Sequence, residues 1–147
     1  MSYLDVITLE RAKNYLRVDD CLIDDDNEIV SMINAACRFV EKRTNHIFYP
    51  QDKTYKQGCQ VKVYDYPINS AVGDPFVCYF STFVVYPNDT EVTLNVGYED
   101  PEDVPDELVQ ACLQMIKVWY YESEKQVNTI LIPESVLQAI DVNRRFI

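Results

Sequence analysis

The spacing of apolar residues changes twice along the chain, and this change limits the fold more than any other feature. From Asn27 to Thr44, apolar side chains recur every three or four residues, as on one face of a helix. A second such stripe runs from Pro105 to about Ser123. Between them, the segment from Ile47 to Tyr98 is rich in valine and tyrosine and alternates in polarity, as half-buried strands do. The sequence therefore predicts helices at both ends and strands in the middle.

Polar residues at the expected helix ends support these boundaries. Thr8 is placed to cap a short helix that runs to about Arg17, because a threonine oxygen can accept a hydrogen bond from a free N–H of the first turn. Asp25 and Glu28 have the spacing of a capping box before the second helix. Asn45 is a plausible left-handed stop for that helix. A fourth helix is expected after Pro133.

Three segments of the middle region are expected to be strands. They are Gln60–Tyr66, Phe76–Tyr86 (two strands around Ser81 and Thr82) and Thr90–Tyr98, with prolines at 50, 67, 75 and 87 at turns or edges. The predicted fold is therefore α+β: a small bundle of about four helices, with an antiparallel β-rich region inserted between the second and third. We expect one domain over residues 1–147, helical over 1–46, β-rich over 47–98 and helical with a C-terminal tail over 99–147.

Length and composition agree with one globular domain. The chain has 147 residues, of which 48% are apolar, enough to form a core. No apolar run approaches the roughly 18–20 residues that span a bilayer, and the first residues do not resemble a signal peptide, so we expect a cytosol or an assembled particle. The five cysteines, at 21, 37, 59, 78 and 112, form no CxxC pair and are expected to be free thiols.

The net charge of −11 is concentrated in two acidic clusters. Their members are Asp19, Asp20, Asp24, Asp25, Asp26 and Glu28 in the first, and Glu99, Asp100, Glu102, Asp103, Asp106 and Glu107 in the second. Affinity for DNA comes largely from lysine and arginine on the phosphates, and this chain has no basic stripe. We therefore expect no tight binding to DNA or to an anionic membrane, although DNA could pass nearby without adhering.

The residues for the common catalytic and cofactor sites are largely missing. A Ser/His/Asp or Cys/His site would have to use His46, the one histidine, and nothing near it in sequence supports that role. Three glycines cannot build a phosphate-binding loop. An EF-hand loop starting at Asp24 would need glycine and glutamate where Ile29 and Ala35 stand, so these acids are expected to favour a helix N-terminus instead. We expect no enzyme activity, metal or cofactor.

Two further patterns allow more than one interpretation. Trp119-Tyr120-Tyr121 resembles a stacking surface, but Trp119 continues the apolar stripe of its helix, so core packing is the favoured interpretation. The carboxylates from Glu99 to Glu107 precede a helix, and their use as paired catalytic acids stays open. Exposed tyrosines of the β-rich region are candidates for a protein interface, where tyrosine is enriched.

Three segments in order carry a resemblance to a known family. They are Ile7–Asp19 (ITLERAKNYLRVD), Asp24–Thr44 (ending VEKRT), and Val96–Ala111 (VGYEDPEDVPDELVQA) leading to Trp119-Tyr-Tyr-Glu122. Together they resemble the head–tail connector proteins of tailed bacteriophages, also called adaptor or head-completion proteins, over about two thirds of the chain. The family usually has glycine after the second helix, where this chain has Asn45, and the β-rich middle is longer than expected.

The resemblance implies a structural role in the virion. Such proteins form a ring, usually dodecameric, that docks on the portal protein, extends the DNA channel and links the capsid to the tail. Implied partners are other copies of the chain, the portal, and a downstream connector, stopper or tail protein; DNA passes through the ring without tight binding. No cofactor and no membrane are implied. The expected location is the head–tail interface, after assembly in the host bacterial cytoplasm.

Two groups of residues are candidates for the partner contacts. The tail residues Arg144, Arg145, Phe146 and Ile147 are candidates for portal binding, and the alternative is a tail that folds back with Phe146 in the core. Tyr64, Tyr66, Val72, Asp74 and Tyr79 are candidates for contact with the downstream protein. Two other functions stay open: an acidic module that binds a basic protein partner, and a small hydrolase that uses the carboxylates from Glu99 to Glu107.

Overall fold

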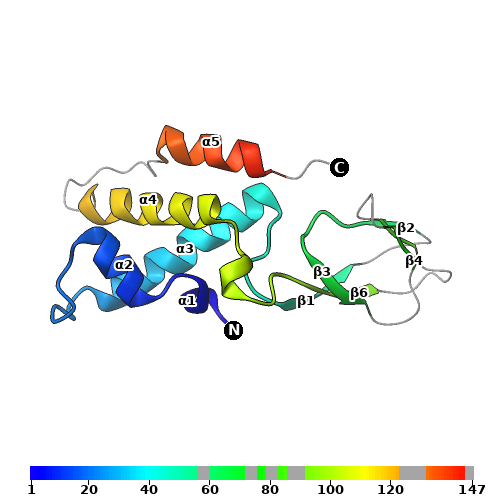
Figure 1. Cartoon of the computed structure of the whole chain (residues 1–147), viewed down its shortest axis with the longest axis horizontal. Helices are drawn as coiled ribbons and strands as arrows, with labels where there is room; N and C mark the ends of the chain where they lie inside the picture. The colour runs from blue at the N-terminus through cyan, green and yellow to red at the C-terminus, as the bar shows by residue number, and fades with distance from the viewer. Residues whose placement is uncertain (56–59, 72–75, 79–82, 86–91, 123–131, 145–147) are drawn as a thin grey trace.

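A computed structural model of the chain describes residues 1–55, 60–71, 76–78, 83–85, 92–122 and 132–144, with helices at one end and strands at the other (Figure 1). The helices are α1 (Tyr3–Val6), α2 (Leu9–Leu16), α3 (Asp26–Thr44), the 3-10 turn η1 (Pro101–Asp103), α4 (Asp106–Glu122) and α5 (Glu134–Asn143). The strands are β1 (Gln51–Tyr55), β2 (Gln60–Lys62), β3 (Ile68–Ala71), β4 (Phe76–Cys78), β5 (Phe83–Val85) and β6 (Val92–Val96). This confirms the predicted α+β fold, with the β-rich region between α3 and α4.

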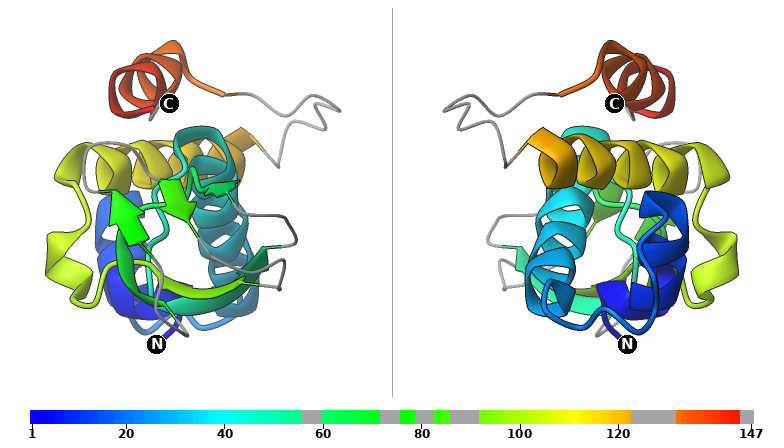
Figure 2. Two further views of the ribbon diagram at one scale, coloured as in Figure 1. Left: turned by 90° about the vertical axis from the view of Figure 1, so that its right-hand side faces the viewer. Right: turned by 90° about the vertical axis from the view of Figure 1, so that its left-hand side faces the viewer.

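The helices stack in layers. Figure 2 shows α5 on the outside of α4, and α4 lying across α2 and α3. The core between these layers comes from the predicted apolar stripes, with side chains such as Ile33, Val40, Leu108 and Ile116 fully buried. The described residues form five α-helices where about four were expected, because α1 is one turn long and too short to show a periodic pattern.

The ends of α2 and α3 follow the local sequence at three of four positions. Thr8 Oγ1 accepts a hydrogen bond from the N–H of Arg11 at 3.1 Å, and Asn45 ends α3 with a φ of 63°. Arg17 ends α2 in the same left-handed conformation. The capping box predicted at Asp25 is wrong: its side chain makes no cap hydrogen bond. Its backbone, at φ −96° and ψ 1°, is outside the extended region from which a capping side chain normally reaches the first turn.

The strands form two three-stranded antiparallel sheets, where one small sheet was expected. Their strand orders are β1-β6-β3 and β2-β5-β4. In the first sheet, Gln51 lies opposite Val96 and Tyr55 opposite Val92. The predicted pairs of strands around residues 81–82 and the strand near 90–98 are present as β4, β5 and β6. Both β1 and β3 were missed, because segments such as Gln-Asp-Lys-Thr-Tyr contain too few apolar residues to alternate visibly.

The strand predicted over Gln60–Tyr66 ends at Lys62, and hydrogen bonds at Tyr66 explain why it does not continue. The N–H of Tyr66 donates to the carbonyl of Asn45 at 2.9 Å, and its carbonyl accepts from Ile47 at 2.8 Å. The main chain at Tyr66 therefore pairs with the segment that leaves α3 rather than with another strand of β2's sheet.

Two adjacent residues join the helical core to the sheet core. Ile47 packs with Val63, Leu94 and Val96 in a small core under the first sheet. Phe48, the next residue, is fully buried in the helical core. Because neighbouring side chains of an extended segment point in opposite directions, one short stretch supplies both cores. The two halves of the molecule are therefore held at a fixed junction immediately after α3.

Candidate interaction surfaces

The first acidic cluster is a loop built around a buried lysine. Lys13, on the buried side of α2, is 3% exposed. Its Nζ donates to the carbonyls of Asp20 (3.2 Å) and Leu22 (2.7 Å) and to Asp26 Oδ1 (2.8 Å). An ammonium group has three donors, and all three are used here. The loop between α2 and α3 is thus held by a protein cation at its centre.

This acidic loop, residues 19–25, presents two apolar side chains to solvent. Leu22 is 59% exposed and Ile23 is 70% exposed. Acidic residues stand on both sides of the pair, and Asp19, Asp20, Asp24 and Asp25 are all exposed. Adjacent exposed aliphatic residues on a loop fixed from inside form a feature suited to contact with another protein.

The single histidine has a structural position. His46 is 9% exposed and lies between α3 and the sheets. Its Nε2 lies 3.0 Å from the carbonyl of Asn143 and must donate to it, since a carbonyl only accepts. In the neutral ring Nδ1 then accepts from Tyr98 OH, 2.7 Å away. Both ring nitrogens therefore serve the junction between α5 and the β-rich region, which agrees with the structural role expected for His46.

The other candidates for chemistry are dispersed. Cys37 and Cys112 are buried, and burial and the neighbouring Cys37 thiol raise the pKa of Cys112 well above its ordinary value. The carboxylates of Glu99, Glu102 and Asp106 are exposed rather than gathered in a cleft. Within the described parts of the chain, no group of three or more His, Cys, Asp or Glu could hold a metal ion. No described helix is both long and apolar enough to cross a bilayer.

The aromatic triplet at the end of α4 joins helices together. Trp119 packs against the helical core, as favoured from its position in the stripe. Tyr120 OH donates to Asp25 Oδ2 at 2.7 Å, and Tyr121 OH donates to the carbonyl of Leu16. These hydrogen bonds connect α4 to the start of α3 and to the end of α2.

Two of the five candidate residues for the downstream contact are described, and both are on the surface. Tyr64 is 42% exposed and Tyr66 is 38% exposed. The Tyr66 ring also meets the His46 ring edge-on, at 5.5 Å between centroids, so it serves the junction as well. Val72, Asp74 and Tyr79 lie outside the described residues.

The candidate portal-binding tail begins where α5 ends. Arg144, the first residue after the helix, is exposed. Arg145, Phe146 and Ile147 lie outside the described residues, so their role stays a prediction. The carbonyl of Asn143, which His46 holds, fixes the point from which this tail leaves the domain.

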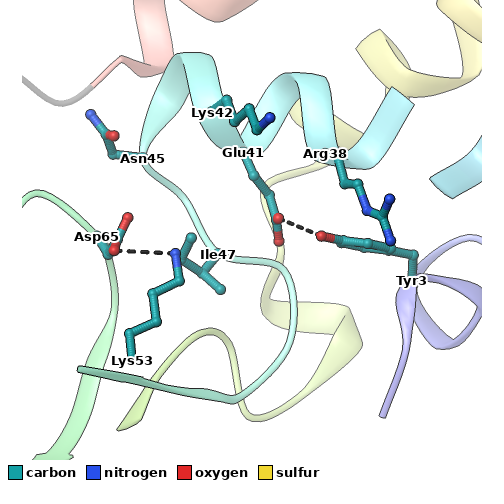
Figure 3. Close-up of a pocket in the computed structure, with 8 residues that line it drawn as sticks. All are labelled: Tyr3, Arg38, Glu41, Lys42, Asn45, Ile47, Lys53 and Asp65. Atoms are coloured by element: carbon teal, nitrogen blue, oxygen red, sulfur yellow. Dashed lines mark hydrogen bonds and ion pairs between the residues drawn. The ribbon is translucent and has the colours of Figure 1, made fainter. Parts of the chain in front are cut away.

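A pocket of about 420 Å³ lies between α1, α3 and the first sheet (Figure 3). Arg38, Glu41 and Lys42 enter it from α3. Tyr3 lines it from α1 and Lys53 from β1, and the remaining lining residues are Asn45, Ile47 and Asp65. Lys53 Nζ lies 3.2 Å from Asp65 Oδ2. The pocket thus contains three cationic side chains and two carboxylates, in a chain where acids outnumber bases nearly two to one.

Glu41 forms the floor of this pocket and is 8% exposed. Its Oε2 accepts from Tyr3 OH at 2.6 Å and its Oε1 accepts from the N–H of Phe48 at 2.8 Å (Figure 3). Burial raises the pKa of Glu41 above its ordinary value of 4.5, while these two hydrogen bonds oppose the rise. Burial and the hydrogen bond to Glu41 also raise the pKa of Tyr3. Glu41 therefore connects α1, α3 and the segment leading to β1.

Solved structures with a similar arrangement of helices and strands are known. A protein chain in the neck of an empty gene transfer agent (GTA) particle, from a structure computed with C6 symmetry, superposes with a TM-score of 0.69 at 15% identity; the alignment covers 96% of this chain and 90% of that one. The chain has the fold of a particle neck protein. A chain from the virion of the native gene transfer agent particle matches with the same TM-score and coverage at 13% identity.

At these identities the likeness is one of fold. In sequence, no protein-family model matches the chain and no curated protein is similar to it. The alignment spans the helices and the β-rich region alike, so the long middle segment belongs to the shared architecture rather than to an unrelated insertion.

Sequence reasoning missed Lys13 and the pocket. Lys13 could have been found, because it lies four residues after Leu9 and next to Ala12 on the apolar face of the predicted helix. A lysine at such a position must either be buried beside hydrogen-bond acceptors or extend its ammonium group past the apolar face to solvent. The pocket had no comparable signal, because Tyr3, Glu41 and Asp65 are far apart in sequence.

Proposed function

We propose that this chain is a structural subunit of a head–tail connector ring in a phage-like particle. The observation that carries the proposal is the fold, shared over almost the whole chain with a protein of a gene transfer agent particle neck. The three segments that resemble phage connector proteins support the same assignment from the sequence. In this role the ring docks on the portal, extends the DNA channel and links the capsid to the tail, at the head–tail interface of a virion assembled in the host cytoplasm.

The surface chemistry is compatible with a passive structural role. His46 is engaged by both ring nitrogens, and the exposed carboxylates of Glu99 and Glu102 do not converge on a cleft. These observations favour a non-enzymatic subunit over the small hydrolase. The net charge of −11 would keep DNA from adhering to the ring during passage, because like charges repel.

We assign the two ends of the molecule to different partners. The helices would form the body of the ring. Neighbouring copies would contact each other head to tail, and the repeated contact would close the ring. The sheet of β2, β4 and β5, at the end farthest from the helices (Figure 1), would face the downstream connector, stopper or tail protein, together with Tyr64 and Tyr66. The tail from Arg144 to Ile147 would dock on the portal.

A second candidate function is an acidic module that binds a basic protein. The exposed acidic loop with its two apolar side chains favours this alternative. It differs from the connector in one measurable respect: the module would act as a single copy beside a basic partner, whereas the connector acts as a ring of copies.

Imaging the particle that contains this chain tests the proposal. Electron microscopy of purified particles, with the chain carrying a small epitope for labelling, should place a symmetric ring of copies between the head and the tail. The ring's copy number, for which the connector family suggests twelve, can be read from the same images. Label on single copies away from the head–tail axis, or label missing from the particles, would contradict the connector role.

A further inference from the structure

We propose that the pocket beside Glu41 receives the acidic loop, residues 19–25, of a neighbouring copy of this chain. The inference rests on the proposed ring and assigns the two surfaces that would join its subunits. It commits to one class of ligand: a short acidic peptide segment with aliphatic residues at its tip, supplied by a second copy.

The cations at the rim of the pocket are available for a carboxylate partner. Arg38 and Lys42 are four residues apart on α3, so they lie on the same face of the helix, and both are exposed. Among the described residues, neither has an acidic group within 4 Å, although the chain carries 24 acids. Lys53, which is less exposed than these two residues, is already paired with Asp65. An incoming carboxylate would therefore meet Arg38 and Lys42 first.

The carboxylate inside the pocket does not cancel this attraction. Glu41 is held by Tyr3 OH and by the N–H of Phe48, so both of its oxygens already have donors. Burial also raises its pKa, so Glu41 keeps a proton to a higher pH than an exposed glutamate does. Figure 3 shows the Arg38 guanidinium beside Tyr3.

The acidic loop has the matching chemistry. Asp20 and Asp24 are exposed, and within the described residues neither side chain forms a hydrogen bond or an ion pair. Leu22 and Ile23 between them would lose contact with water on docking. Because Lys13 fixes the loop from inside, little conformational entropy would be lost when it binds.

The positions of the two surfaces suit a repeating contact. The acidic loop precedes the first residue of α3, and Arg38 and Lys42 lie in its last two turns. A helix of 19 residues is about 28 Å long, so the two surfaces lie near opposite ends of one rigid element. Neither surface can reach the other within one copy. A contact between opposite ends of identical subunits is heterologous, and such contacts close into a ring when the rotation allows.

The second acidic cluster is a weaker candidate for the same pocket. Its carboxylates at Glu99 and Glu102 are exposed, but Val104, the nearest aliphatic residue along the chain, is buried in the helical core. It offers charge without an apolar tip. The two clusters therefore provide a matched comparison for the experiment.

Charge exchange in the full chain tests the contact. Arg38→Glu with Lys42→Glu, and separately Asp20→Lys with Asp24→Lys, should each weaken self-association in sedimentation experiments by about tenfold or more, because each places like charges together. The chain that carries all four substitutions should regain self-association, since the charges are exchanged but still complementary. Arg11→Glu with Lys117→Glu, and Glu99→Lys with Glu102→Lys, are controls of equal charge change and should have little effect. Circular dichroism confirms that each variant is folded.

Cross-linking identifies the residues that meet. A carbodiimide joins lysines directly to carboxylates, and mixing isotope-labelled with unlabelled chains marks the links between copies. Links from Lys42 or Lys53 to Asp20 or Asp24 are expected between labelled and unlabelled chains. If copies associate but their links lie elsewhere, or if the four-fold variant does not recover, the pocket assignment is overturned while the connector role stands.

If the isolated chains do not associate in solution, a synthetic peptide of the acidic loop can test the contact instead. The segment of residues 18–26, added to labelled protein, should shift the NMR signals of Arg38, Lys42 and Lys53, and the shift should shrink with added salt because the contact is electrostatic. A peptide that leaves these signals unchanged, with no links between copies, overturns the inference. Imaging of the particle decides the connector role independently of either result.

Discussion

Glu41 is the residue at which burial and charge conflict most directly. It occupies the last turn of α3 and touches both halves of the molecule, through Tyr3 in the helical part and through Phe48 at the junction. Replacing a buried carboxylate usually leaves donors unsatisfied, so the group stabilises the junction even though its charge is costly to bury. The balance between these effects depends on pH.

Glu41→Gln should change how stability depends on pH. Burial raises the pKa of Glu41 above 4.5, so the folded chain keeps this proton to a higher pH than the unfolded chain. The favourable contribution of this group to the free energy of unfolding is therefore complete below the unfolded pKa and is lost as pH rises through the folded pKa. Glutamine has no such proton, and its changed hydrogen bonds add a term that does not vary with pH. Urea denaturation between about pH 4 and about pH 8 should show that the free energy of unfolding of the variant increases, relative to that of the wild type, as pH rises.

Tyr3→Phe is the matched second variant for that experiment. The Tyr3 hydroxyl lowers the pKa of Glu41, so its removal should raise that pKa further and extend the loss of stability to higher pH. A difference between wild type and Glu41→Gln that stays constant over the whole range would show that Glu41 does not titrate differently on folding.

Gly97 is the second residue whose identity the structure requires. Its φ is 124°, and a Cβ there would lie 2.1 Å from the carbonyl oxygen of Tyr49, which belongs to the backbone and cannot rotate away. Gly97→Ala should therefore lower the free energy of unfolding by roughly 3 kcal/mol, through strain and displacement of the chain. Asn69→Ala removes the hydrogen bonds to the Gly97 carbonyl and to Asn95 Oδ1 without adding an atom, and should cost about 1 kcal/mol because Asn69 is exposed. Equal losses for the two variants, measured by chemical denaturation, would contradict the steric explanation.

At the scale of elements, periodicity predicted the long helices and failed for short or polar pieces. The stripes of α3 and α4 extend over several turns, so their spacing is unambiguous. Helix α1 is a single turn, so its apolar residues cannot show a helical period. In β1 the exposure of the side chains alternates, but most of these residues are polar, so the alternation is not visible in the sequence. The end of α3 at Asn45 was predicted because Asn tolerates positive φ, whereas Asp25 as a cap depended on a backbone angle that sequence does not specify.

The acidic loop is an element that one buried side chain, Lys13, holds through three hydrogen bonds. Lys13→Met keeps the apolar stem of the lysine but removes three hydrogen bonds, one of which is the ion pair with Asp26. The free energy of unfolding should fall by roughly 2–3 kcal/mol, less than for a fully enclosed ion pair because Asp26 is partly exposed and the carbonyls can rehydrate. Hydrogen exchange of the amides at 19–25 should quicken at the same time.

Lys117→Met is the control for this prediction. Lys117 is an exposed lysine on α4 whose Nζ lies 5.8 Å from the centre of the Tyr15 ring, and its replacement should change the free energy of unfolding by less than about 1 kcal/mol. An unchanged exchange rate in the loop of the Lys13 variant would mean that the loop is held by something other than the buried ammonium group.

At the scale of the whole molecule, the surfaces that we propose for partner contacts lie at different ends of the chain's structure. The acidic loop and the basic rim of the pocket lie near opposite ends of α3, and the β-rich region extends to one side of the helices (Figure 1). The sequence predicted the helices and the β-rich region, and the structure shows that two of the candidate interface tyrosines, Tyr64 and Tyr66, are exposed. It could not predict the pocket, because Tyr3, Glu41 and Asp65 meet only after α1 and both halves have packed.

The charge of the whole chain predicts its behaviour toward DNA. Thirteen basic residues against 24 acidic ones, with Arg38 and Lys42 in a pocket that two carboxylates also line, provide no continuous track for phosphates. The isolated protein should show no binding to duplex DNA in a mobility-shift assay at physiological salt. Salt-sensitive binding at micromolar protein would contradict this and would point to a role at the DNA itself rather than around it.

The tail provides the last prediction, and the structure determines where to cut it. Removing Asn143 would also remove the carbonyl that His46 holds and the side chain that donates to Ala139, so a deletion from 143 would disturb α5 itself. Removal of residues 145–147 leaves these contacts in place. If the tail anchors the ring to the portal, this truncation should leave the thermal midpoint nearly unchanged but abolish co-assembly with the portal, because one buried Phe or Arg anchor contributes about 2 kcal/mol or more, and a ring repeats that loss in every subunit.

Single substitutions separate anchoring from folding back. Phe146→Ala should reproduce the loss of co-assembly, while Val142→Ser, which changes an apolar side chain that is 84% exposed in the last turn of α5, should not. A tail that folds back onto its own domain would behave oppositely. The thermal midpoint would then fall with Phe146→Ala, since a buried aromatic side chain is lost from the core, and that fall would accompany any loss of assembly. Normal co-assembly by the truncated chain would rule out the anchor.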